Sequence, residues 1–258
     1  MVFALLQSRL HELWALSFGL TQGEKPRYKP PSCFETFPFP REMGPLDGPD
    51  FETSLALEDV GDKYLDFRAK ILLSSEEGLT KVYNRFHDPA EISGEIMDLR
   101  RLHSEMDQSV LGAYKWDDVV TACGFGLDSV DLADDVQLSD ELQERIASDE
   151  IFFWDANEAL DFQSQLQAQG VITGRSKLPW HYRWPDAVRD DVLARLLALN
   201  AERYEEEVLL GLHSKGAKQA AKAAGAGGAS GKRRGRPLKA AKADETEVHQ
   251  AEQMGLGL

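Results

Sequence analysis

The chain has 258 residues, enough for one or two domains, and its 28% charged and 42% hydrophobic residues are an ordinary balance for a soluble protein. The net charge of −15 is uneven, because residues 1–213 hold 20 bases and 40 acids whereas 214–243 hold nine bases and no acid. The overall electrostatic field of a body this acidic does not attract DNA phosphates. Contact with DNA would therefore require a local basic patch or another subunit.

The cysteines and the hydropathy of the chain indicate the cellular compartment to expect. Cys33 and Cys123 stand alone, without a CxxC motif or a Cys/His cluster, which predicts two free buried thiols in a reducing cytoplasm. No apolar run reaches the roughly 18 residues that a membrane helix needs. Arg9, His11 and Glu12 interrupt the apolar N-terminus and no small-residue cleavage site follows, so we expect neither a membrane partner nor a signal peptide.

Residues 3–18 predict an amphipathic helix. Its apolar residues recur at spacings of three and four: Phe3, Leu6, Leu10, Leu13 and Trp14. The stripe begins at the third residue without a capping residue before it, and so large an apolar face needs a cover. We expect the chain to begin within a domain whose other part supplies this cover. The alternative is that the helix packs on the body of its own chain.

The segment Arg27–Pro40, RYKPPSCFETFPFP, holds four prolines and four aromatic residues. Proline lacks a backbone N–H, fixes φ at about −65° and biases the preceding residue towards extended geometry. Phe37 and Phe39 each precede a proline, so the pattern excludes them from a helix. It predicts an edge strand or polyproline segment that presses its rings onto a neighbour. The alternative is a hydrophobic linker packed on its own domain.

The middle of the chain predicts three helices, over 53–75, 80–87 and 92–114. Apolar residues recur at helical spacing in the two long segments, and short links favour antiparallel neighbours, so we expect a helical hairpin or bundle. The short helix carries three polar residues, Asn84, Arg85 and His87. These residues either mark a turn that faces DNA or bond to backbone groups at helix ends.

The region from 116 to 213 predicts short elements followed by one long helix. They are a helix at 139–146, a strand or anchor at 151–154, a helix at 157–169, a strand or clasp at 178–184, and a helix from 185 to about 212. Ser139 is a plausible N-cap because its oxygen can accept from free amides. Gly170 suits the residue after a helix, and Pro185 suits a first helical turn.

Residues 214–243 predict no packed structure, because Ala, Gly and Lys dominate and large apolar side chains are too few to offset chain entropy. The candidate DNA-binding residues lie in this tail: Lys232, Arg233, Arg234, Gly235, Arg236 and Pro237. They resemble an AT-hook, whose flat guanidinium groups fit the narrow A·T minor groove while glycine permits close approach. The alternative is a basic tail that binds any polyanion through counterion release.

Several segments, in order, resemble one family. Arg27–Pro40, preceded by SRLHELWAL, resembles the end of the target-recognition region of adenine-specific DNA methyltransferases of the type IIG restriction–modification kind. GLTKVYNRFHDP at 78–89 and RRLHSEMDQSVLGAYKW resemble the helical tail after that region, and 182–207 resembles its last helix. The resemblance covers most of residues 1–210. It implies that the chain recognises and positions double-stranded DNA together with a separate catalytic polypeptide.

The catalytic motifs of that family are missing from this sequence. It has neither an Asn-Pro-Pro-Tyr/Phe site for a flipped base nor a Gly-rich loop for S-adenosylmethionine, because Gly124-Phe125-Gly126 lacks a following glycine. We therefore assign no catalytic, cofactor-binding or metal-binding residue. The resemblance implies that S-adenosylmethionine is bound by a part that this chain lacks, and enzyme activity of the chain itself stays open.

The sequence predicts a mainly α fold, with a helical hairpin or bundle, a short extended or β segment near the N-terminus and a disordered basic C-terminal tail. We divide it into the end of a target-recognition region at 1–40, a linker at 41–52, a helical domain at 53–213 and a basic then acidic tail at 214–258. The expected function is DNA recognition and positioning for an adenine methyltransferase. The alternative is a freestanding, non-catalytic DNA-binding protein with an acidic helical body and an AT-hook-like tail.

Overall fold

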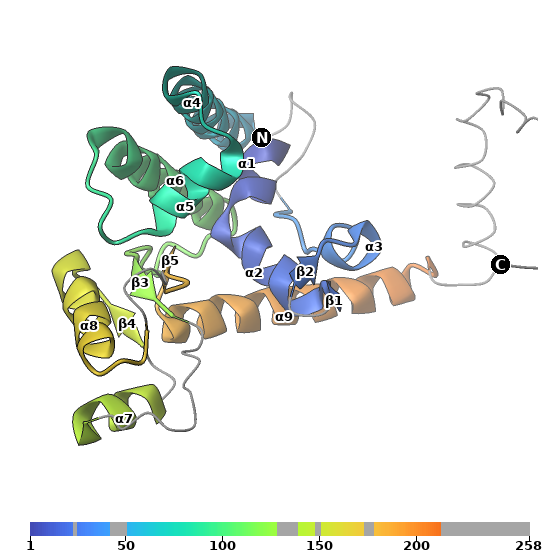
Figure 1. The fold of residues 1–258 in the computed structure, drawn as a ribbon. Helices are drawn as coiled ribbons and strands as arrows, with labels where there is room; N and C mark the ends of the chain where they lie inside the picture. The colour runs from blue at the N-terminus through green and yellow to red at the C-terminus, as the bar shows by residue number, and fades with distance from the viewer. Residues whose placement is uncertain (23–24, 42–50, 128–138, 148–150, 173–177, 213–258) are drawn as a thin grey trace, which may run out of the picture. The chain divides into compact units, whose positions relative to one another are not determined.

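The computed structural model of the chain describes residues 1–22, 25–41, 51–127, 139–147, 151–172 and 178–212. Residues Met1–Glu207 form one compact unit and Val208–Leu258 another. Helices dominate the described part of the first unit, and two small antiparallel sheets complete it (Figure 1). The predicted mainly α fold is therefore confirmed.

The element bounds follow the predicted pattern over most of the described chain. The helices are α1 (Val2–Gln7), α2 (Arg9–Phe18), α3 (Pro30–Cys33), α4 (Phe51–Ser75), α5 (Leu79–His87), α6 (Gly94–Ala113), α7 (Asp140–Ala147), α8 (Ala156–Ala168) and α9 (Asp186–Leu209). The strands are β1 (Leu20–Gln22), β2 (Lys25–Arg27), β3 (Gly124–Gly126), β4 (Phe152–Phe153) and β5 (His181–Arg183). Helices α4 to α9 lie close to their predicted bounds, because their apolar residues recur at helical spacing.

The predicted N-terminal helix is broken into α1 and α2 at an extended residue, Ser8. The Ser8 Oγ donates to the Leu5 carbonyl at 2.7 Å, and the Arg9 amide donates to Asp107 Oδ1 at 2.9 Å. In a continuous helix the Arg9 amide would donate to the Leu5 carbonyl, so these two contacts replace that bond. The prediction of one helix is wrong here because the partner of Arg9 lies 98 residues further along the chain.

The apolar face of α1 and α2 is covered by other parts of the same chain. Leu5 and Leu10 are fully buried, and Trp14 is 2% exposed. They belong to the main hydrophobic core, which also contains Tyr64 of α4 and Leu99 of α6. The expectation of a cover from outside these residues is therefore wrong, and the alternative, packing on the body of the same chain, is what the structure shows.

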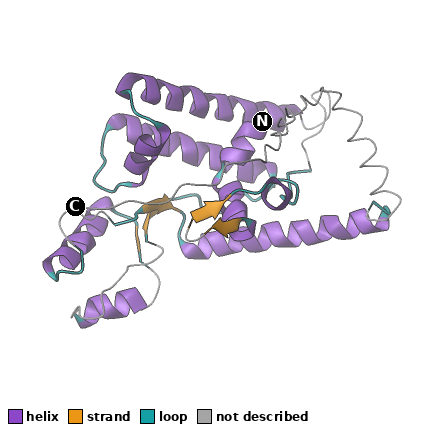
Figure 2. Cartoon of the chain, turned by 45° about the vertical axis from the view of Figure 1, so that its right-hand side comes forward, coloured by secondary structure: helices purple, strands orange, loops and turns teal. Residues whose placement is uncertain are grey.

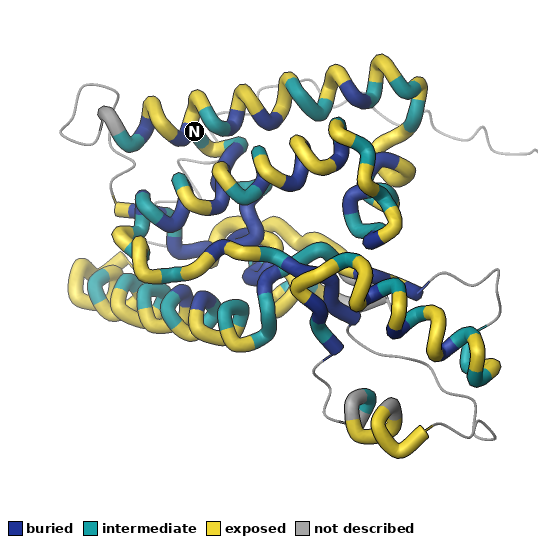
Figure 3. Tube along the Cα trace, turned by 90° about the vertical axis from the view of Figure 1, so that its left-hand side faces the viewer, coloured by how far each residue is buried: buried dark blue, intermediate teal, exposed yellow. Residues whose placement is uncertain are grey.

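Helices α4 and α6 form the predicted antiparallel pair. Tyr64 near the middle of α4 packs on His103 near the middle of α6, with 5.3 Å between their ring centroids. Arg85 of α5 binds both Glu77, which follows α4, and Glu95, at the start of α6. The end of α4 therefore lies near the start of α6. Figure 3 shows α4 along the top, with buried positions recurring on the side that faces its neighbours.

The three-stranded sheet has the order β4-β3-β5, and both of its strand pairs are antiparallel (Figure 2). Glycines permit the close approach at the central strand: a Cβ on Gly124 would overlap the Phe153 carbonyl oxygen, and one on Gly126 would lie 2.7 Å from Arg183 Nε. Phe125 points into a second core beside α8. Strand β3 was not predicted, because glycine is unfavourable in strands unless neighbours require it.

Candidate nucleic-acid interface

The aromatic stretch Arg27–Pro40 is attached to the body by side chains from separate helices. Asn200 of α9 donates from Nδ2 to the Thr36 carbonyl at 2.7 Å. Tyr114, just after α6, donates from its hydroxyl to the Pro38 carbonyl at 3.0 Å. Such bonds satisfy carbonyls that have no partner in regular secondary structure, so they fix the course of the stretch across the body.

The rings of the stretch pack on α2. Phe37 is 4% exposed, and its ring meets His11 edge-on at 4.7 Å between centroids and Phe39 at 5.0 Å. Both phenylalanines lie outside helices, as predicted. The prediction of extended backbone is wrong at Pro30–Cys33, which form the short helix α3. Prolines occupy the first turn of that helix, where their missing N–H groups need no partner.

Two basic side chains project where the stretch begins. Strands β1 and β2 form a hairpin in which Leu20 faces Arg27. Arg27 and Lys29 are both exposed, and Lys29 also has extended backbone, with φ −120° and ψ 110°. Side chains two residues apart in extended backbone point to the same side, so Arg27 and Lys29 form a small positive edge. We call these two residues the hairpin cations.

Tyr28 lies between the hairpin cations in the sequence, and its side chain contacts α2. Its hydroxyl lies 3.0 Å from His11 Nε2, and its ring is tilted against the His11 ring at 5.8 Å between centroids. Burial lowers the pKa of His11 from 6.5 to about 4, so the imidazole is neutral at physiological pH. The contact is therefore a neutral hydrogen bond that holds the edge in place without adding charge.

Most other basic side chains of the described body form ion pairs with carboxylates of the same chain. Carboxylates pair with Arg9, Arg41, Lys63, Lys81, Arg85, Arg101, Arg183, Arg189 and Arg195. Within the described ranges, the exposed residues Arg27, Lys29 and Lys70 form no such ion pair. Lys70 lies by itself on α4, whereas the hairpin cations stand together. Within the described ranges, the hairpin cations are therefore two neighbouring exposed bases without an ion pair.

The candidate residues predicted from the sequence lie elsewhere. Lys232, Arg233, Arg234, Gly235, Arg236 and Pro237 fall outside the described residues, so the structure brings them to no site. The hairpin cations were not among the predicted site residues. The signal that points to them is a short acid-free run with a base at every second position, Lys25, Arg27 and Lys29.

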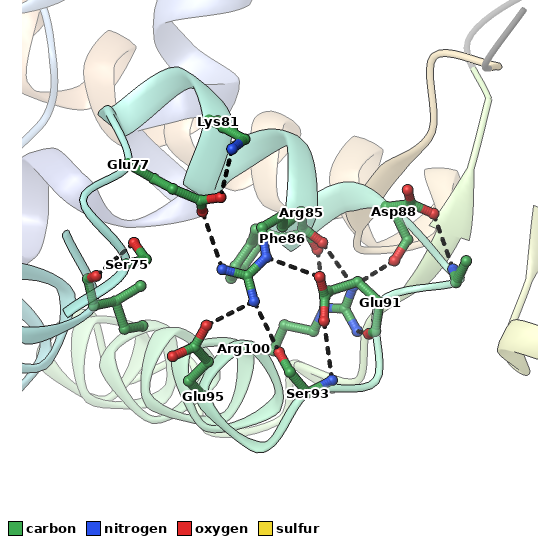
Figure 4. Close-up of polar contacts among 12 residues, drawn as sticks. Ser75, Glu77, Lys81, Arg85, Phe86, Asp88, Glu91, Ser93, Glu95 and Arg100 are labelled. Carbon is green, nitrogen blue, oxygen red and sulfur yellow. Dashed lines mark hydrogen bonds and ion pairs between the residues drawn. The ribbon is translucent and has the colours of Figure 1, made fainter. Parts of the chain in front are cut away.

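Arg85 is enclosed by acidic side chains (Figure 4). Its guanidinium donates to Glu91 at 2.8 Å, to Glu77 at 3.1 Å and to Glu95 at 2.6 Å. A fourth bond goes to Ser93 Oγ at 3.1 Å. A guanidinium with this many acceptors has little capacity left for a phosphate, so the contacts favour the structural alternative for Arg85 over a turn that faces DNA.

His87 is also occupied within the fold. Its Nδ1 accepts a hydrogen bond from the Tyr182 amide at 3.0 Å, which joins α5 to β5. Burial, followed by the charge of His181, lowers the pKa of His87 to about 3. The side chain is therefore neutral and turned to the backbone, whereas Asn84 is exposed on the same helix.

The Arg85 cluster predicts a specific sensitivity to acid. Hydrogen bonds from Arg85 and Ser93 lower the pKa of Glu91 from 4.5 to about 2. A carboxyl with a lowered folded-state pKa contributes stability that is present above about pH 4.5 and is lost as the pH falls towards 2. We expect the urea midpoint of Glu91→Gln to fall less than that of the parent between about pH 5 and pH 2.5. Glu105→Gln, which removes an exposed partner of Arg101, serves as the control, and parallel parent and Glu91→Gln curves would refute the assignment.

The cavities offer little reaction chemistry. A surface groove of about 450 Å³ lies beside α6 and is lined by one ionisable residue, Asp117. Its polar groups bond to one another, since Gln108 Nε2 donates to Thr121 Oγ1 at 2.9 Å and Ser104 Oγ donates to the Thr121 carbonyl at 3.5 Å. Polar groups already paired in this way are poor candidates for binding a cofactor or activating a nucleophile.

A smaller cavity of about 160 Å³ is lined by residues of α1, α2, α5, α6 and β5, among them Arg9, Glu12, His87 and His103. Arg9 is already paired with Asp107, and burial lowers the pKa of His103 to about 4.

In the part of the chain that the structure describes, no group of three or more His, Cys, Asp or Glu residues is placed to hold a metal ion. Nor does any described helix have the length and apolar character to cross a membrane.

Comparison with known proteins yields no relative. No protein-family model matches the sequence, and no curated protein or solved structure is significantly similar to it. The function is therefore inferred from the residues of the site and from the sequence segments that, in their order along the chain, resemble one family.

Proposed function

We propose that the chain grips and positions double-stranded DNA for a site-specific adenine methyltransferase whose methyl-transfer centre lies on a separate polypeptide. The observation that carries the proposal is the pair of hairpin cations, which are exposed and form no ion pair among the described residues. They open the stretch that resembles the end of a target-recognition region. The acidic body around them makes the hairpin a defined point of contact.

Cations and acids on a protein surface act on a duplex in opposite ways. A base that neutralises a phosphate releases a counterion, and phosphate contacts fix the position of a protein on DNA without reading its sequence. The carboxylates of residues 1–213 repel the duplex elsewhere. Tyr28 and the bonds to Thr36 and Pro38 hold the edge on α2, α6 and α9, so the contact would have a fixed orientation.

The remaining functions would come from the partner and the tail. A flipped adenine needs an enclosing pocket, and methyl transfer needs S-adenosylmethionine; we expect both on a catalytic polypeptide encoded beside this chain. Residues Lys232–Pro237 would add a second contact, in the minor groove. A cytoplasmic location, where bacterial-type restriction–modification acts on DNA, is part of this proposal.

The proposal is tested by DNA affinity as a function of salt. We expect Arg27→Gln/Lys29→Gln in the full chain to weaken binding to a duplex about tenfold at about 0.1 M NaCl. The slope of log K against log salt should shrink by about two, one for each lost phosphate contact. Lys70→Gln removes another exposed base without an ion pair among the described residues, on α4, and should leave affinity and slope close to those of the parent.

A deletion of residues 214–243 separates the proposal from the freestanding DNA-binding alternative. The alternative places all DNA binding in the tail, so deletion should abolish it. Our proposal expects weaker binding that persists after deletion and disappears when Arg27→Gln/Lys29→Gln is added. Complete loss on deletion, with no effect of the hairpin variant in the full chain, would favour the alternative.

A further inference from the structure

A surface cavity of about 210 Å³ lies where the end of the aromatic stretch meets α6 and α9. Three of the residues that line it are cationic: Arg41, which follows the stretch, Lys115, which follows α6, and Arg203 of α9. Its other walls include Pro40, Tyr114 and Leu199. Among the described residues, none of those that line the cavity is acidic. We call it the basic cavity.

Arg203 brings an unpaired positive charge to this cavity. It is only partly exposed, its guanidinium forms no hydrogen bond or ion pair with any described residue, and its Nη2 is buried without a partner. Burial is the main cause that lowers the pKa of Arg203, and the nearby charge of Arg41 lowers it further. An arginine nevertheless stays charged at physiological pH. A partly desolvated cation without a counter-ion favours the binding of an anion beside it.

Lys115 has a backbone conformation that usually belongs to glycine. Its φ is +61°. Its amide donates to the Gly112 carbonyl at 2.9 Å and the Trp116 amide donates to the Leu111 carbonyl at 3.1 Å, which together form the Schellman motif that closes α6. These bonds also satisfy carbonyls that would otherwise repel an anion. A lysine is less favourable than glycine in this conformation, and such positions gather at functional sites, so Lys115 indicates a use for its side chain in the cavity.

The carboxylates that act on Arg203 do not neutralise the basic cavity. They are Glu206 and Glu202, and both are bonded to Arg41, at 2.8 Å and 3.0 Å from its Nη2. All three of these side chains are about half exposed, so their ion pairs are weak. Three cations and two carboxylates leave one net positive charge.

We propose that the basic cavity binds a phosphate group, carried either by a small phosphate ester or by the backbone of a duplex. A phosphate presents oxygens that can accept from cations on several sides, and guanidinium groups match its geometry. One phosphate fills only part of the cavity, which leaves room for the rest of the ester against Pro40, Tyr114 and Leu199. The inference does not depend on the proposed function, because neither the hairpin cations nor the tail takes part.

Urea unfolding of the full chain with and without inorganic phosphate, at matched ionic strength in NaCl, tests the site. With a dissociation constant on the order of 1 mM, about 20 mM phosphate should raise the ratio of folded to unfolded parent about 20-fold through binding. Phosphate also stabilises proteins in general because it is excluded from their surfaces. Arg203→Gln should keep only this general effect, Lys115→Gln should respond less than the parent, and Lys70→Gln should respond like it.

Each variant is compared with itself, so a change in its own stability does not enter the result. Equal responses of the parent and Arg203→Gln to phosphate would overturn the proposal, as would a parent that phosphate does not stabilise. Arg27→Gln/Lys29→Gln should respond to inorganic phosphate like the parent. The basic cavity and the hairpin contact therefore succeed or fail separately.

Duplex binding by Arg203→Gln identifies the source of the phosphate. Affinity that falls severalfold, with a slope of log K against log salt smaller by about one, assigns the cavity to a backbone phosphate. Unchanged duplex affinity, together with stabilisation of the parent by inorganic phosphate that Arg203→Gln lacks, assigns it to a small phosphate ester. Both results support the site, and they differ in the ligand that occupies it.

Discussion

Replacing Asp107 by alanine should lower the free energy of unfolding by about 3–5 kcal/mol, because it leaves a buried guanidinium without its counter-ion. The Asp107 side chain is fully buried and that of Arg9 is 5% exposed. Asp107 accepts from the Arg9 amide at 2.9 Å and from Arg9 Nη1 at 2.6 Å, so it both neutralises a charge and caps the start of α2. Urea denaturation of parent and variant measures the loss.

Two further variants identify the cause of that loss. Glu105→Ala removes an exposed partner of Arg101 on the same helix and should cost less than about 1 kcal/mol, as surface pairs do. Arg9→Met/Asp107→Leu removes both charges and should recover much of the stability lost in Asp107→Ala. An Asp107→Ala variant no less stable than Glu105→Ala would show that the buried pair does not hold α2 in place.

Replacing Arg100 by leucine should destabilise the fold by about 2–4 kcal/mol, because hydrogen bonds from a charged donor are strong and the buried Phe86 carbonyl would lose its bond from Arg100. Arg100 is 9% exposed and donates to the carbonyls of Phe86 at 2.9 Å, Asp88 at 2.9 Å and Glu91 at 3.1 Å. These carbonyls lie at and after the end of α5, where helical amides run out, although the Asp88 carbonyl also accepts from the Glu91 amide at 3.1 Å. Thermal and urea unfolding would report the change.

The neighbouring residue provides a matched control. Arg101 is exposed and binds Asp98 and Glu105 on its own helix, so Arg101→Leu should change stability by less than about 1 kcal/mol. Arg100→Lys should recover only part of the loss, because one ammonium cannot reproduce the planar fork that reaches several carbonyls. Equal stability of Arg100→Leu and Arg101→Leu would contradict the assignment of Arg100 as the residue that closes α5.

Most helices could be predicted from the sequence because apolar residues recur within each at helical spacing. The stripe in 53–75 and Gly170, which has φ +75° after α8, are local features and lie where expected. The break at Ser8 could not be predicted, since it depends on Asp107 taking the Arg9 amide across 98 positions. Strand β3 could not be predicted either, because its glycines are required only by the close approach of Phe153 and Arg183 in the folded chain.

The candidate site was harder to predict than the fold. The basic run at Lys232–Pro237 drew attention because its bases are adjacent in sequence, yet it lies outside the described residues. The alternating bases of Lys25, Arg27 and Lys29 are a weaker sequence signal, and the last two stand out once most other described bases are seen to be paired. Arg85 illustrates this, because its sequence neighbours gave no indication that Glu77, Glu91 and Glu95 would converge on it.

We propose that this chain grips DNA while the methyl-transfer chemistry lies on another polypeptide, and one assay tests this most directly. Transfer of labelled methyl groups from S-adenosylmethionine to duplex DNA should be measured with the chain alone, with the polypeptide encoded beside it, and with both. We expect no transfer by the chain alone, and adenine methylation by the mixture that falls when Arg27→Gln/Lys29→Gln replaces the parent. Methyl transfer by the isolated chain, or a mixture indifferent to the hairpin variant, would contradict it.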